Sequence, residues 1–417
     1  MSYNPPLYKK IFHASRRLLA TRWLARMGAV QIAITGSQGK TTVRTVLSHL
    51  LSKLGNTVVT DLNLDSNFSI PMTALSVKPA TRFAVFECGI DHRGEMDRHL
   101  EIITPHIAVI TGVSPVHTDA EHLGSFENLI AEKQKLIEKL SKDDFAILNF
   151  DDINVRKMAQ HTRAKVIFYG TDKTNCDVSA HNAILTTDGL TFDLTYGGKT
   201  LHLHSHLIGI HHIYTFMAAF CVYRLVTKEK DLDTFPALVA DIVPLHGRMS
   251  MEKGPRGTII LNDSLRANPS STESGLKSFS AIKMPLGKKI AILGEMGELA
   301  HPEEEHRKIG RLIPTLLLDY VFGIGPLQKI VIDEAVANGF PKDRAFAVSN
   351  IHQAVAVLSP LLERGDFLYI KGSLMRHMER IIMLLDRQEV GCTVVVCPFY
   401  HPCHGCEYKV KGYQNAR

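Results

Sequence analysis

Short apolar runs of strand length alternate along this chain with segments in which apolar residues recur at helical spacing. The clearest example is the apolar run from Val30 to Ile34, which is followed by a glycine-containing turn and then by a helical pattern. The apolar positions that predict this helix are Val43, Val46, Leu47, Leu50 and Leu51. Because strands that alternate with helices form parallel sheets, the pattern predicts an α/β fold class.

A different pattern occupies the first 30 residues, where basic and apolar side chains are mixed. Lys9, Arg16 and Arg22 stand among Phe12 and Trp23, which predicts an amphipathic basic helix. The stretch has neither the uninterrupted apolar region nor the small-residue cleavage site of a signal peptide. We expect this helix to pack on the first domain, and the alternative is contact with a membrane surface or an anionic partner.

With 417 residues the chain is too long for one ordinary core, so two or three domains are expected. It contains no run of eighteen apolar residues, which argues against a transmembrane span. A net charge of +6 would suit an anionic small substrate as well as nucleic acid, and we expect no nucleic-acid partner. Four of the seven cysteines cluster in the last 26 residues, unlike the framework of a small secreted domain, so a cytoplasmic location is predicted.

The turn after the first strand carries the most specific chemistry, because it reads G-S-Q-G-K-T-T from Gly36 to Thr42. Backbone N–H groups and the start of a helix converge there on a phosphate. The Lys40 ammonium can neutralise the β- and γ-phosphates of a nucleotide, and the Thr41 hydroxyl can hold Mg²⁺. The loop is a shortened Walker pattern, since Ile34 stands where the full pattern has glycine. The residues predicted to bind ATP here are Gly36, Ser37, Gly39, Lys40, Thr41 and Thr42.

The shortened loop T-G-S-x-G-K-T-T resembles that of the Mur ligase family, and further motifs extend this resemblance. A strand ending in Glu87 is followed by "GEM", the strand "IAVIT", His117, "LGSFE" and Lys133, as in the family. The segments "AILNFDD", "LHGRMSM", "ILNDSLRANPSST", "AILGEMGELAHPEEEH" and "YIKGSLMRHMERI" come next. Their order and spacing are similar to those of the branch that adds D-alanyl-D-alanine to the UDP-muramoyl tripeptide. The resemblance covers most of the chain, from about Ala33 to Asp386.

The resemblance implies a central P-loop ATPase-type parallel-sheet domain followed by a Rossmann-like C-terminal domain. The predicted parts are a basic N-terminal helix at 1–30, an ATP-binding domain at 31–245, a ligase domain at 246–387 and a Cys/His-rich tail at 388–417. Full-length family members begin with a further domain of about a hundred residues that grips the UDP-sugar. Only about 30 residues precede the loop here, so we expect that domain to be missing. Either the substrate lacks UDP, or another part of the chain holds it.

An amide ligase must turn a carboxylate into a group that an amine can attack, and ATP allows this through an acyl phosphate. Catalysis is then mostly charge neutralisation and positioning. Glu87 and His117 end successive predicted strands, at the edge where parallel sheets bind ligands. The resemblance implies that Thr41, Glu87 and His117 hold Mg²⁺. Without it, a strand-end Glu is usually solvated and a lone His usually packs or caps.

Lys133 lies in a charged helix, where a solvated lysine is the ordinary expectation. By resemblance it matches the lysine that many Mur ligases carry as a carbamate, an anion that is able to hold a second metal ion. Lys135 competes for this role, and the spacing from His117 favours Lys133.

Further nucleotide contacts are implied in both domains. Arg248 resembles the arginine that reaches the ATP phosphates, where a guanidinium suits the charge of the transferring group. Asn149 belongs to the strand end "LNFDD", and Asp263 ends a later strand and could accept hydrogen bonds from ribose hydroxyls. The chain departs from the family's "HNxxN" helix start, since His212 and Thr215 stand where asparagines are expected.

The residues that the resemblance places near the incoming amine are Asn268, Lys371 and Ser373. The chain departs from the branch in the same region. Leu265 and Arg266 replace a tyrosine and an asparagine, and Leu374 replaces the usual arginine. Because these changes fall where the acceptor amine is held, the identity of the amine stays open.

The tail has the cysteine spacing C-x4-C-x5-C-x2-C, with His401 and His404 interleaved. The candidate zinc ligands are Cys392, Cys397, Cys403 and Cys406. Only the last pair has C-x2-C geometry, whereas compact four-ligand zinc sites usually carry two such pairs. A structural Zn²⁺ site is therefore one interpretation, and the alternatives are an iron–sulfur cluster or redox pair, or free thiols.

The sequence thus predicts an ATP-dependent amide ligase that joins the amine of an amino acid or dipeptide to a small-molecule carboxylate. The residues predicted to carry catalysis are Lys40, Glu87, His117, Lys133 and Arg248. The predicted cofactors are ATP and Mg²⁺, with Zn²⁺ as an addition in the tail. Within this class a muramoyl-peptide ligase competes with a stand-alone enzyme of another biosynthetic pathway. The alternative from another class is a nucleotide-binding regulatory or scaffold subunit without ligase activity, and the oligomeric state is left open.

Overall fold

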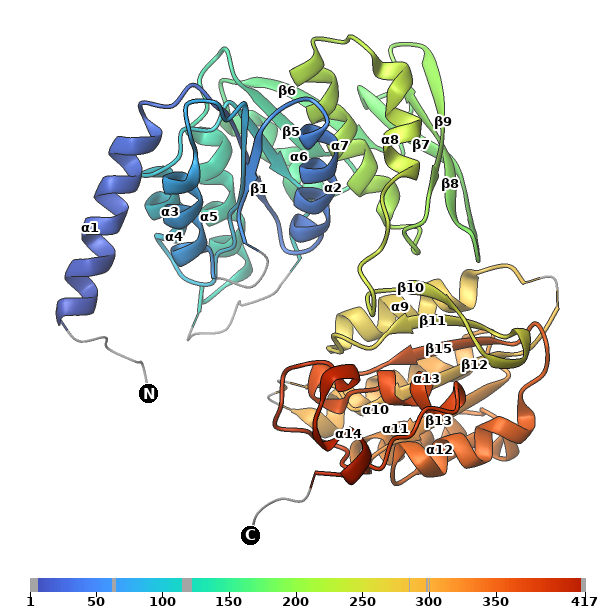
Figure 1. The fold of residues 1–417 in the computed structure, drawn as a ribbon. Coiled ribbons are helices and arrows are strands. Elements are labelled where there is room, and N and C mark those ends of the chain that lie inside the picture. Colours follow the sequence, from blue (N-terminus) through green and yellow to red (C-terminus); the bar gives the residue numbers. More distant parts are fainter. Residues whose placement is uncertain are drawn as a thin grey trace. The chain divides into compact units, whose positions relative to one another are not determined.

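The structure is a computed structural model that describes residues 7–61, 65–114, 122–284, 286–297, 299 and 301–413, with side chains from residue 12 onward. The chain forms two compact units. The first consists of Met1–Ala183, Thr191–Ser205 and His211–Ile242, and the second of Ile184–Leu190, His206–Ile210 and Val243–Arg417. Figure 1 shows the helices and strands of both units.

In the described residues of the first unit, a nine-stranded sheet has the order β2-β3-β1-β4-β5-β6-β7-β8-β9. The strands are β1 (Val30–Thr35), β2 (Thr57–Val59), β3 (Phe83–Glu87), β4 (Ile107–Ile110), β5 (Phe145–Asn149), β6 (Lys165–Gly170), β7 (Val178–Thr186), β8 (Gly189–Tyr196) and β9 (Lys199–Ser205). From β2 to β7 all neighbours pair in parallel. β1 lies between β3 and β4, so the loop after β1 opens where the strand order reverses, and ligands of such sheets bind at this point.

The helices of this unit are α1 (Leu7–Leu24), α2 (Lys40–Ser52), α3 (Ser66–Ser76), α4 (Glu95–Leu100), α5 (Phe126–Glu138), α6 (Ile153–Met158), α7 (His212–Thr227) and α8 (Phe235–Ala240). The five apolar positions predicted to form the inner face of α2 are all buried, which confirms that prediction. Ile32, Ala33 and Ile34 are consecutive in β1 and all fully buried, as expected for a strand covered on both faces.

α1 packs against the first unit through a few specific contacts. Arg17 forms an ion pair with Glu101, and the indole nitrogen of Trp23 donates a hydrogen bond to the Val77 carbonyl at 2.7 Å. Phe12 is nevertheless 62% exposed. None of the helices in the described part of the chain combines the length and apolarity that crossing a bilayer requires.

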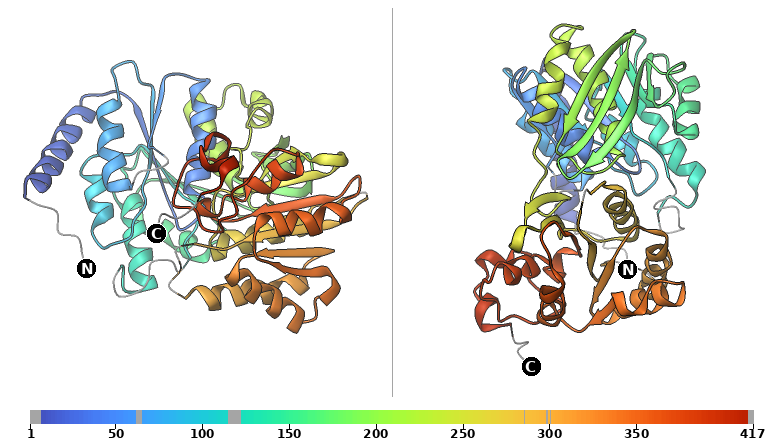
Figure 2. Two further views of the ribbon diagram at one scale, coloured as in Figure 1. Left: turned by 60° about the horizontal axis from the view of Figure 1, so that its bottom comes forward. Right: turned by 90° about the vertical axis from the view of Figure 1, so that its right-hand side faces the viewer.

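The strands β7, β8 and β9 follow one another through two-residue loops, which join antiparallel neighbours. The second loop is Gly197-Gly198, with φ values of 49° and 76°, the left-handed conformation that a tight hairpin turn demands. Figure 2 shows these strands standing together as a twisted extension of the sheet, with α8 packed against β9.

The second unit holds a six-stranded sheet of order β10-β11-β15-β12-β13-β14 among its described residues. Among the described strands of this sheet, only the β10–β11 pair is antiparallel. The strands are β10 (Ser250–Lys253), β11 (Ile259–Asp263), β12 (Lys289–Gly294), β13 (Tyr320–Ile324), β14 (Ala345–Val348) and β15 (Phe367–Lys371). The helices are α9 (Pro269–Ala281), α10 (Pro302–Leu312), α11 (Pro326–Ala337), α12 (Ile351–Leu358), α13 (Glu379–Leu385) and α14 (Tyr408–Lys411). Parallel sheets flanked by helices in both units confirm the predicted α/β class.

Residues after α13 form the Cys/His-rich tail, which lies beside α13 in both Figure 1 and Figure 2. The tail has little regular structure apart from α14 and a short 3-10 turn at Cys403–Gly405. Its apolar members Val390 and Cys403 join the core cluster formed by β-strand residues and by α12 and α13. The tail is therefore packed into the second unit.

Candidate active site

The phosphate loop closely approaches the end of β4. The Ser37 amide donates to the Gly112 carbonyl at 2.7 Å, and the Ser37 hydroxyl donates to the Ser114 carbonyl at 2.9 Å. Gly36 has φ of 149° and Gly39 has φ of 82°, backbone conformations that residues with a Cβ rarely adopt. The loop therefore needs glycine at these two positions to turn from β1 into α2.

Replacing Gly36 by alanine should distort the loop. A Cβ at this position would lie 2.0 Å from the Thr111 hydroxyl oxygen and 3.0 Å from the Gly112 carbonyl oxygen. We expect a loss of about 1–3 kcal/mol in the free energy of unfolding, and ATP binding weakened by about tenfold or more. Thermal unfolding and nucleotide titration measure these effects. Gly28→Ala is the matched control, because a Cβ there meets nothing within 4 Å. Equal behaviour of the two variants would contradict the prediction.

Lys40 begins α2 and its side chain folds back over the loop. Its ammonium donates to the Gly36 carbonyl at 2.7 Å and to the Ser37 carbonyl at 3.3 Å. Burial lowers the pKa of Lys40, and the nearby Glu87 carboxylate opposes this shift. The ammonium thus lies at the predicted phosphate loop, where it is bonded to carbonyls of the loop itself.

Thr41 and Glu87 come together at the end of β3. The Thr41 hydroxyl donates to Glu87 Oε1 at 2.8 Å, and Glu87 Oε2 lies 3.7 Å from Nε of Arg44. Hydroxyl and carboxylate oxygens are donors that Mg²⁺ prefers, so this pair fits the predicted metal. His117, the third predicted ligand, lies outside the described residues.

Lys133 reaches the same loop from α5. Its ammonium donates to the Gly36 carbonyl at 3.0 Å, although the two residues are 97 positions apart. Lys133 is 2% exposed, and its burial, together with repulsion from Lys40, lowers its pKa to about 7. Lys135 instead forms ion pairs with Asp97 at 2.6 Å and Glu132 at 2.8 Å, so the structure brings only Lys133 to the loop.

The low pKa of Lys133 has a consequence for stability. Its pKa is about 7 in the folded chain and near 10.4 in an unfolded one, so between these values the unfolded chain holds a proton that the folded chain has released. The free energy of unfolding should therefore rise with pH in this window. Relative to Lys133→Met, the wild type should gain up to about 2 kcal/mol from pH 7.5 to 9.

Chemical denaturation in CO₂-free buffer at several pH values measures this gain. Lys135→Met is the control, because Lys135 is partly exposed and ion-paired, and it should leave the pH profile unchanged in this window. A profile of Lys133→Met that parallels the wild type from pH 7.5 to 9 would show that Lys133 does not titrate there.

Two residues that support the loop, Thr111 and Arg44, were not indicated by the sequence. Asn149 was predicted to contact nucleotide, and its amide nitrogen donates to the Thr111 carbonyl at 2.9 Å. The Thr111 hydroxyl in turn donates to the Gln38 carbonyl at 2.5 Å, which ties β5 to the loop. Arg44 is 2% exposed and orients Glu87 while it donates to the Thr60 carbonyl. The helical pattern around Arg44 did not indicate that its side chain is buried.

In the second unit, Asp263 and Lys371 form a buried ion pair. Lys371 Nζ lies 2.6 Å from Asp263 Oδ2, which also accepts a hydrogen bond from the Tyr369 hydroxyl at 2.8 Å. Lys371 is 2% exposed and its ammonium also donates to the Arg266 carbonyl at 2.8 Å. The structure thus joins a predicted ribose contact and a predicted amine contact in one cluster.

The remaining predicted residues of this unit lie at turns. Asn268 is the N-cap of α9, where its side chain accepts from the Ser271 amide at 2.8 Å. The Ser373 hydroxyl is buried and makes no hydrogen bond with the described residues. Arg248 is half-buried, and its amide donates to the Leu245 carbonyl at 2.9 Å.

A second, largely buried ion pair lies close to Ser373 and joins the "GEMGEL" segment to the residues after "KGS". Arg376 Nη2 lies 3.0 Å from Glu295 Oε2, and Glu295 Oε1 accepts from the Leu327 amide at 3.1 Å. The amide of Ser373 donates to the Glu295 carbonyl at 3.4 Å. Glu295 therefore connects the two segments. In the sequence, the only sign of this role is that the residue is acidic.

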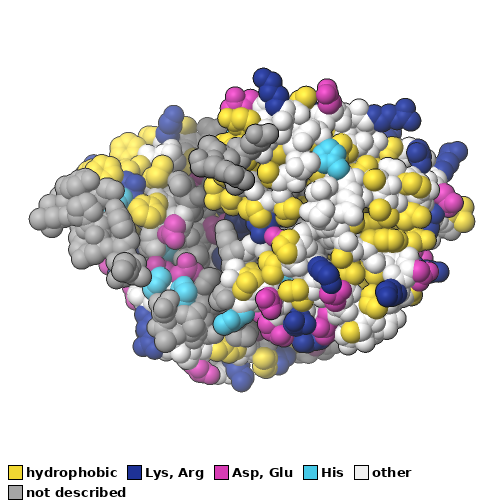
Figure 3. All heavy atoms as spheres, turned by 90° about the horizontal axis from the view of Figure 1, so that it is seen from below, with side chains coloured by type: hydrophobic (Ala, Val, Ile, Leu, Met, Phe, Trp, Pro, Cys, Tyr) yellow, Lys and Arg dark blue, Asp and Glu magenta, His cyan; other side chains and the backbone are white. Residues whose placement is uncertain are grey.

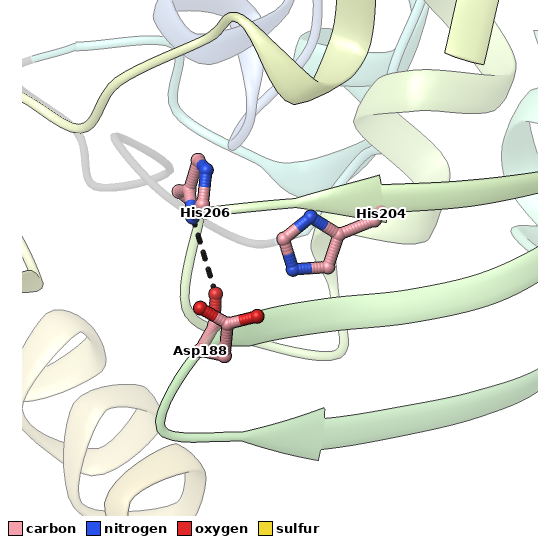
Figure 4. Close-up of side chains that lie close together, drawn as sticks. All are labelled: Asp188, His204 and His206. Atoms are coloured by element: carbon pink, nitrogen blue, oxygen red, sulfur yellow. Dashed lines mark hydrogen bonds between the residues drawn. The ribbon is translucent and has the colours of Figure 1, made fainter. Parts of the chain in front are cut away.

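Side chains of metal-binding type gather in two groups within the described chain, each with its ligand atoms within 4.8 Å of one another. One group is Asp188, His204 and His206, near the turn between β7 and β8 (Figure 4). There a ring nitrogen of His206 lies 3.2 Å from the Asp188 carbonyl oxygen, a contact that joins the strand end to the turn. The other is His377, Glu379 and Cys403. Neither group contains more than one of the four tail cysteines.

The fold and the loop chemistry agree with the comparisons to known proteins. The model of the Mur ligase middle domain matches residues 34–223, and the model described as "Mur ligase, glutamate ligase domain" matches residues 247–374. The chain therefore belongs to the Mur ligase family, whose members are ATP-dependent ligases, and the predicted family and enzyme class are confirmed.

Several named proteins are similar to this chain. The UDP-N-acetylmuramoyl-tripeptide–D-alanyl-D-alanine ligase of Escherichia coli is 26% identical over 357 residues, covering 85% of this chain and 76% of that protein. The ligase of the same name from Bacillus subtilis is 27% identical over 367 residues, covering 87% and 77%. MurF from Acinetobacter baumannii has a similar fold, with a TM-score of 0.74, 23% identity and coverage of 90% and 81%. The MurF ligase from Thermotoga maritima in complex with ADP has a TM-score of 0.73, 20% identity and coverage of 90% and 84%.

Proposed function

We propose that this chain uses ATP to activate a carboxylate as an acyl phosphate and then joins it to the amine of an amino acid or dipeptide. The observation that carries the proposal is the convergence of Lys40 and Lys133 on the Gly36 carbonyl, beside the Thr41–Glu87 oxygen pair. The Lys40 ammonium and a metal-binding oxygen pair at one glycine loop suit a polyphosphate and a carboxylate, and the Lys133 amine lies beside them.

The proposed reaction has two steps. A carboxylate oxygen of the substrate attacks the γ-phosphorus of ATP, and the bond to the leaving ADP breaks. The amine nitrogen then attacks the acyl carbon, loses a proton, and expels inorganic phosphate as the amide forms. Both steps develop negative charge on phosphate oxygens, so the chain's task is to neutralise that charge and to position the reactants.

In the first unit, Lys40 and the loop amides would bind the phosphates. Thr41, Glu87 and His117 would hold Mg²⁺, which supplies charge neutralisation at the phosphate oxygens. Lys133 would carry a carbamate, and its pKa of about 7 supports this because only the neutral amine reacts with CO₂. The remaining nucleotide contacts of the proposal are Ser37, Thr42 and Asn149 in this unit, and Arg248 and Asp263 in the second.

In the second unit, the proposal assigns the amine substrate to Asn268, Lys371 and Ser373. The buried Ser373 hydroxyl, which has no hydrogen-bond partner among the described residues, supports its part in this. Asn268 already caps α9, and Lys371 already forms an ion pair with Asp263. In this proposal they would therefore fix the shape of the site and keep these partners when the amine binds.

A phosphate-release assay tests the proposal. The names of the relatives provide the first pair of substrates, a UDP-muramoyl tripeptide and D-alanyl-D-alanine. Free amino acids and other carboxylates form the rest of the panel. We expect ADP and phosphate only when a carboxylate and an amine are both present, and turnover reduced about 100-fold or more in Lys133→Ala.

Lys135→Ala is the matched control, because Lys135 lies in the same helix but ion-pairs away from the loop, and it should keep near wild-type turnover. Nucleotide binding without substrate-dependent phosphate release across the panel would favour the regulatory or scaffold alternative.

Figure 3 shows one face on which the described Lys and Arg side chains are dispersed among Asp and Glu. Binding of an anionic substrate would therefore depend on local groups such as those of the loop.

We also propose a cytoplasmic location, membrane-surface contact through α1, and Zn²⁺ bound in the tail, either by its four cysteines or by a ligand set that includes one of them. Cys392, Cys397 and Cys403 are buried and Cys406 is half-buried, and all four are free thiols.

A further inference from the structure

The start of α13 carries a buried group of potential metal ligands that the ligase reaction does not use. His377, Glu379 and Cys403 each offer one ligand atom, and these atoms lie within 4.8 Å of one another. His377 is 1% exposed, Glu379 is 8% exposed and Cys403 is 6% exposed. The three residues come from both sides of the junction between α13 and the tail.

The contacts of His377 require either a second proton on its ring or a cation beside it. Its Nε2 lies 2.9 Å from the Phe399 carbonyl oxygen, and its Nδ1 lies 2.9 Å from Glu379 Oε1. A neutral imidazole has one N–H, yet both ring nitrogens face acceptors here. Either an extra proton or a metal ion must stand between the ring and the carboxylate.

The carboxylate of Glu379 is only partly satisfied. Its Oε1 accepts a hydrogen bond from the Cys403 amide at 3.2 Å, whereas its Oε2 is buried and receives no hydrogen bond from the described residues. A buried carboxylate oxygen without a partner is costly unless a cation reaches it. An ion bound between His377 and Cys403 would meet this oxygen.

We propose that His377 Nδ1, the Glu379 carboxylate and Cys403 Sγ bind one Zn²⁺ ion, which fastens the tail to α13. Imidazole nitrogen, carboxylate oxygen and thiolate sulfur are the three ligand types that zinc takes in proteins. The Phe399 carbonyl accepts the Nε2–H of His377, an outer contact that leaves Nδ1 free of a proton and fixes the ring. The carboxylate and the thiolate supply two negative charges, which balance the ion.

This ligand set differs from the four cysteines that the sequence suggested. Cys392 has another partner, since its sulfur lies 3.3 Å from Nη1 of the buried Arg380, which also donates to the Cys392 and Val394 carbonyls. Arg380 thus holds one part of the tail by hydrogen bonds, and the zinc ion would hold the next. Glu379 and Arg380 are adjacent residues at the start of α13, so both contacts with the tail begin in the first turn of this helix.

Metal analysis of the full chain tests the inference without reference to ligase activity. After incubation with Zn²⁺ and gel filtration, the wild type should retain about one equivalent by elemental analysis. Cys403→Ser and Glu379→Gln should each lower the retained zinc about fivefold or more. Cys392→Ser is the matched control and should retain the wild-type amount, because serine can accept the same Arg380 hydrogen bond.

Cobalt substitution of the wild type provides a readout that needs no folded variant. Co²⁺ bound by Cys403 should show a thiolate charge-transfer band in the near ultraviolet, together with the visible bands of a tetrahedral site. A wild-type chain that retains neither zinc nor cobalt would overturn the proposal. Loss of zinc in Cys392→Ser with full retention in Glu379→Gln would also overturn it, in favour of the cysteine set.

Discussion

Turnover of the ligase reaction should fall about 10²–10³-fold when Lys40 is replaced by methionine, a side chain of similar length without charge. The ammonium of Lys40 stands over the phosphate loop, 2.7 Å from the Gly36 carbonyl, and burial has removed part of its hydration. A cation that is already desolvated and positioned stabilises developing phosphate charge strongly. The loss should therefore appear mainly in kcat, with a smaller rise in the KM for ATP.

Substrate-dependent phosphate release measures this loss, and circular dichroism checks that the variant folds. Lys53→Met is the control, because Lys53 is an exposed lysine at the other end of the same helix and should leave turnover unchanged. Wild-type turnover in Lys40→Met would mean that the nucleotide binds elsewhere, and would remove the central element of the proposed function.

The parts of the fold that local sequence determines were predictable. The strand, glycine turn and helix around the loop depend on residues within a few positions of one another, and the buried face of α2 has the predicted members. The family motifs also gave the enzyme class, because six ordered motifs are far more specific than one loop.

Features that depend on long-range contacts were not predictable from pattern alone. Lys133 lies in a charged helix, and only its approach to Gly36, 97 positions away, gives it a low pKa. Asp263 and Lys371 were assigned to separate substrates, whereas they form one ion pair across 108 positions. In both cases the sequence shows that the side chain is charged, but it does not show which residue is the partner.

The tail shows a related limit. Counting cysteines led to a four-thiol zinc site, because cysteine spacing is the visible signal in a sequence. The buried group of potential metal ligands combines one of these cysteines with His377 and Glu379, which precede the tail and carry no spacing motif. Asn268 was assigned to the amine from the family motif. The local sequence also predicts the helix cap that it forms, because Pro269 and Ser271 follow it.

The buried ion pair of the second unit should prove essential for its stability. Lys371→Met is expected to lower the free energy of unfolding by about 3–5 kcal/mol, because it leaves the Asp263 carboxylate buried without its counter-charge. Chemical denaturation of the full chain measures the loss. The control is Lys277→Met, which removes an exposed ion pair with Glu273 and should cost less than about 1 kcal/mol.

A double variant separates this structural role from a role in substrate binding. In Asp263→Leu/Lys371→Met both charges are gone, so most of the stability lost in the single variant should return. Activity should stay low in the double variant, because both residues belong to the proposed substrate contacts, Asp263 to the nucleotide and Lys371 to the amine. If Lys371→Met unfolds like the wild type and only the KM for the amine rises, then the pair is not a structural element and Lys371 acts on the substrate alone.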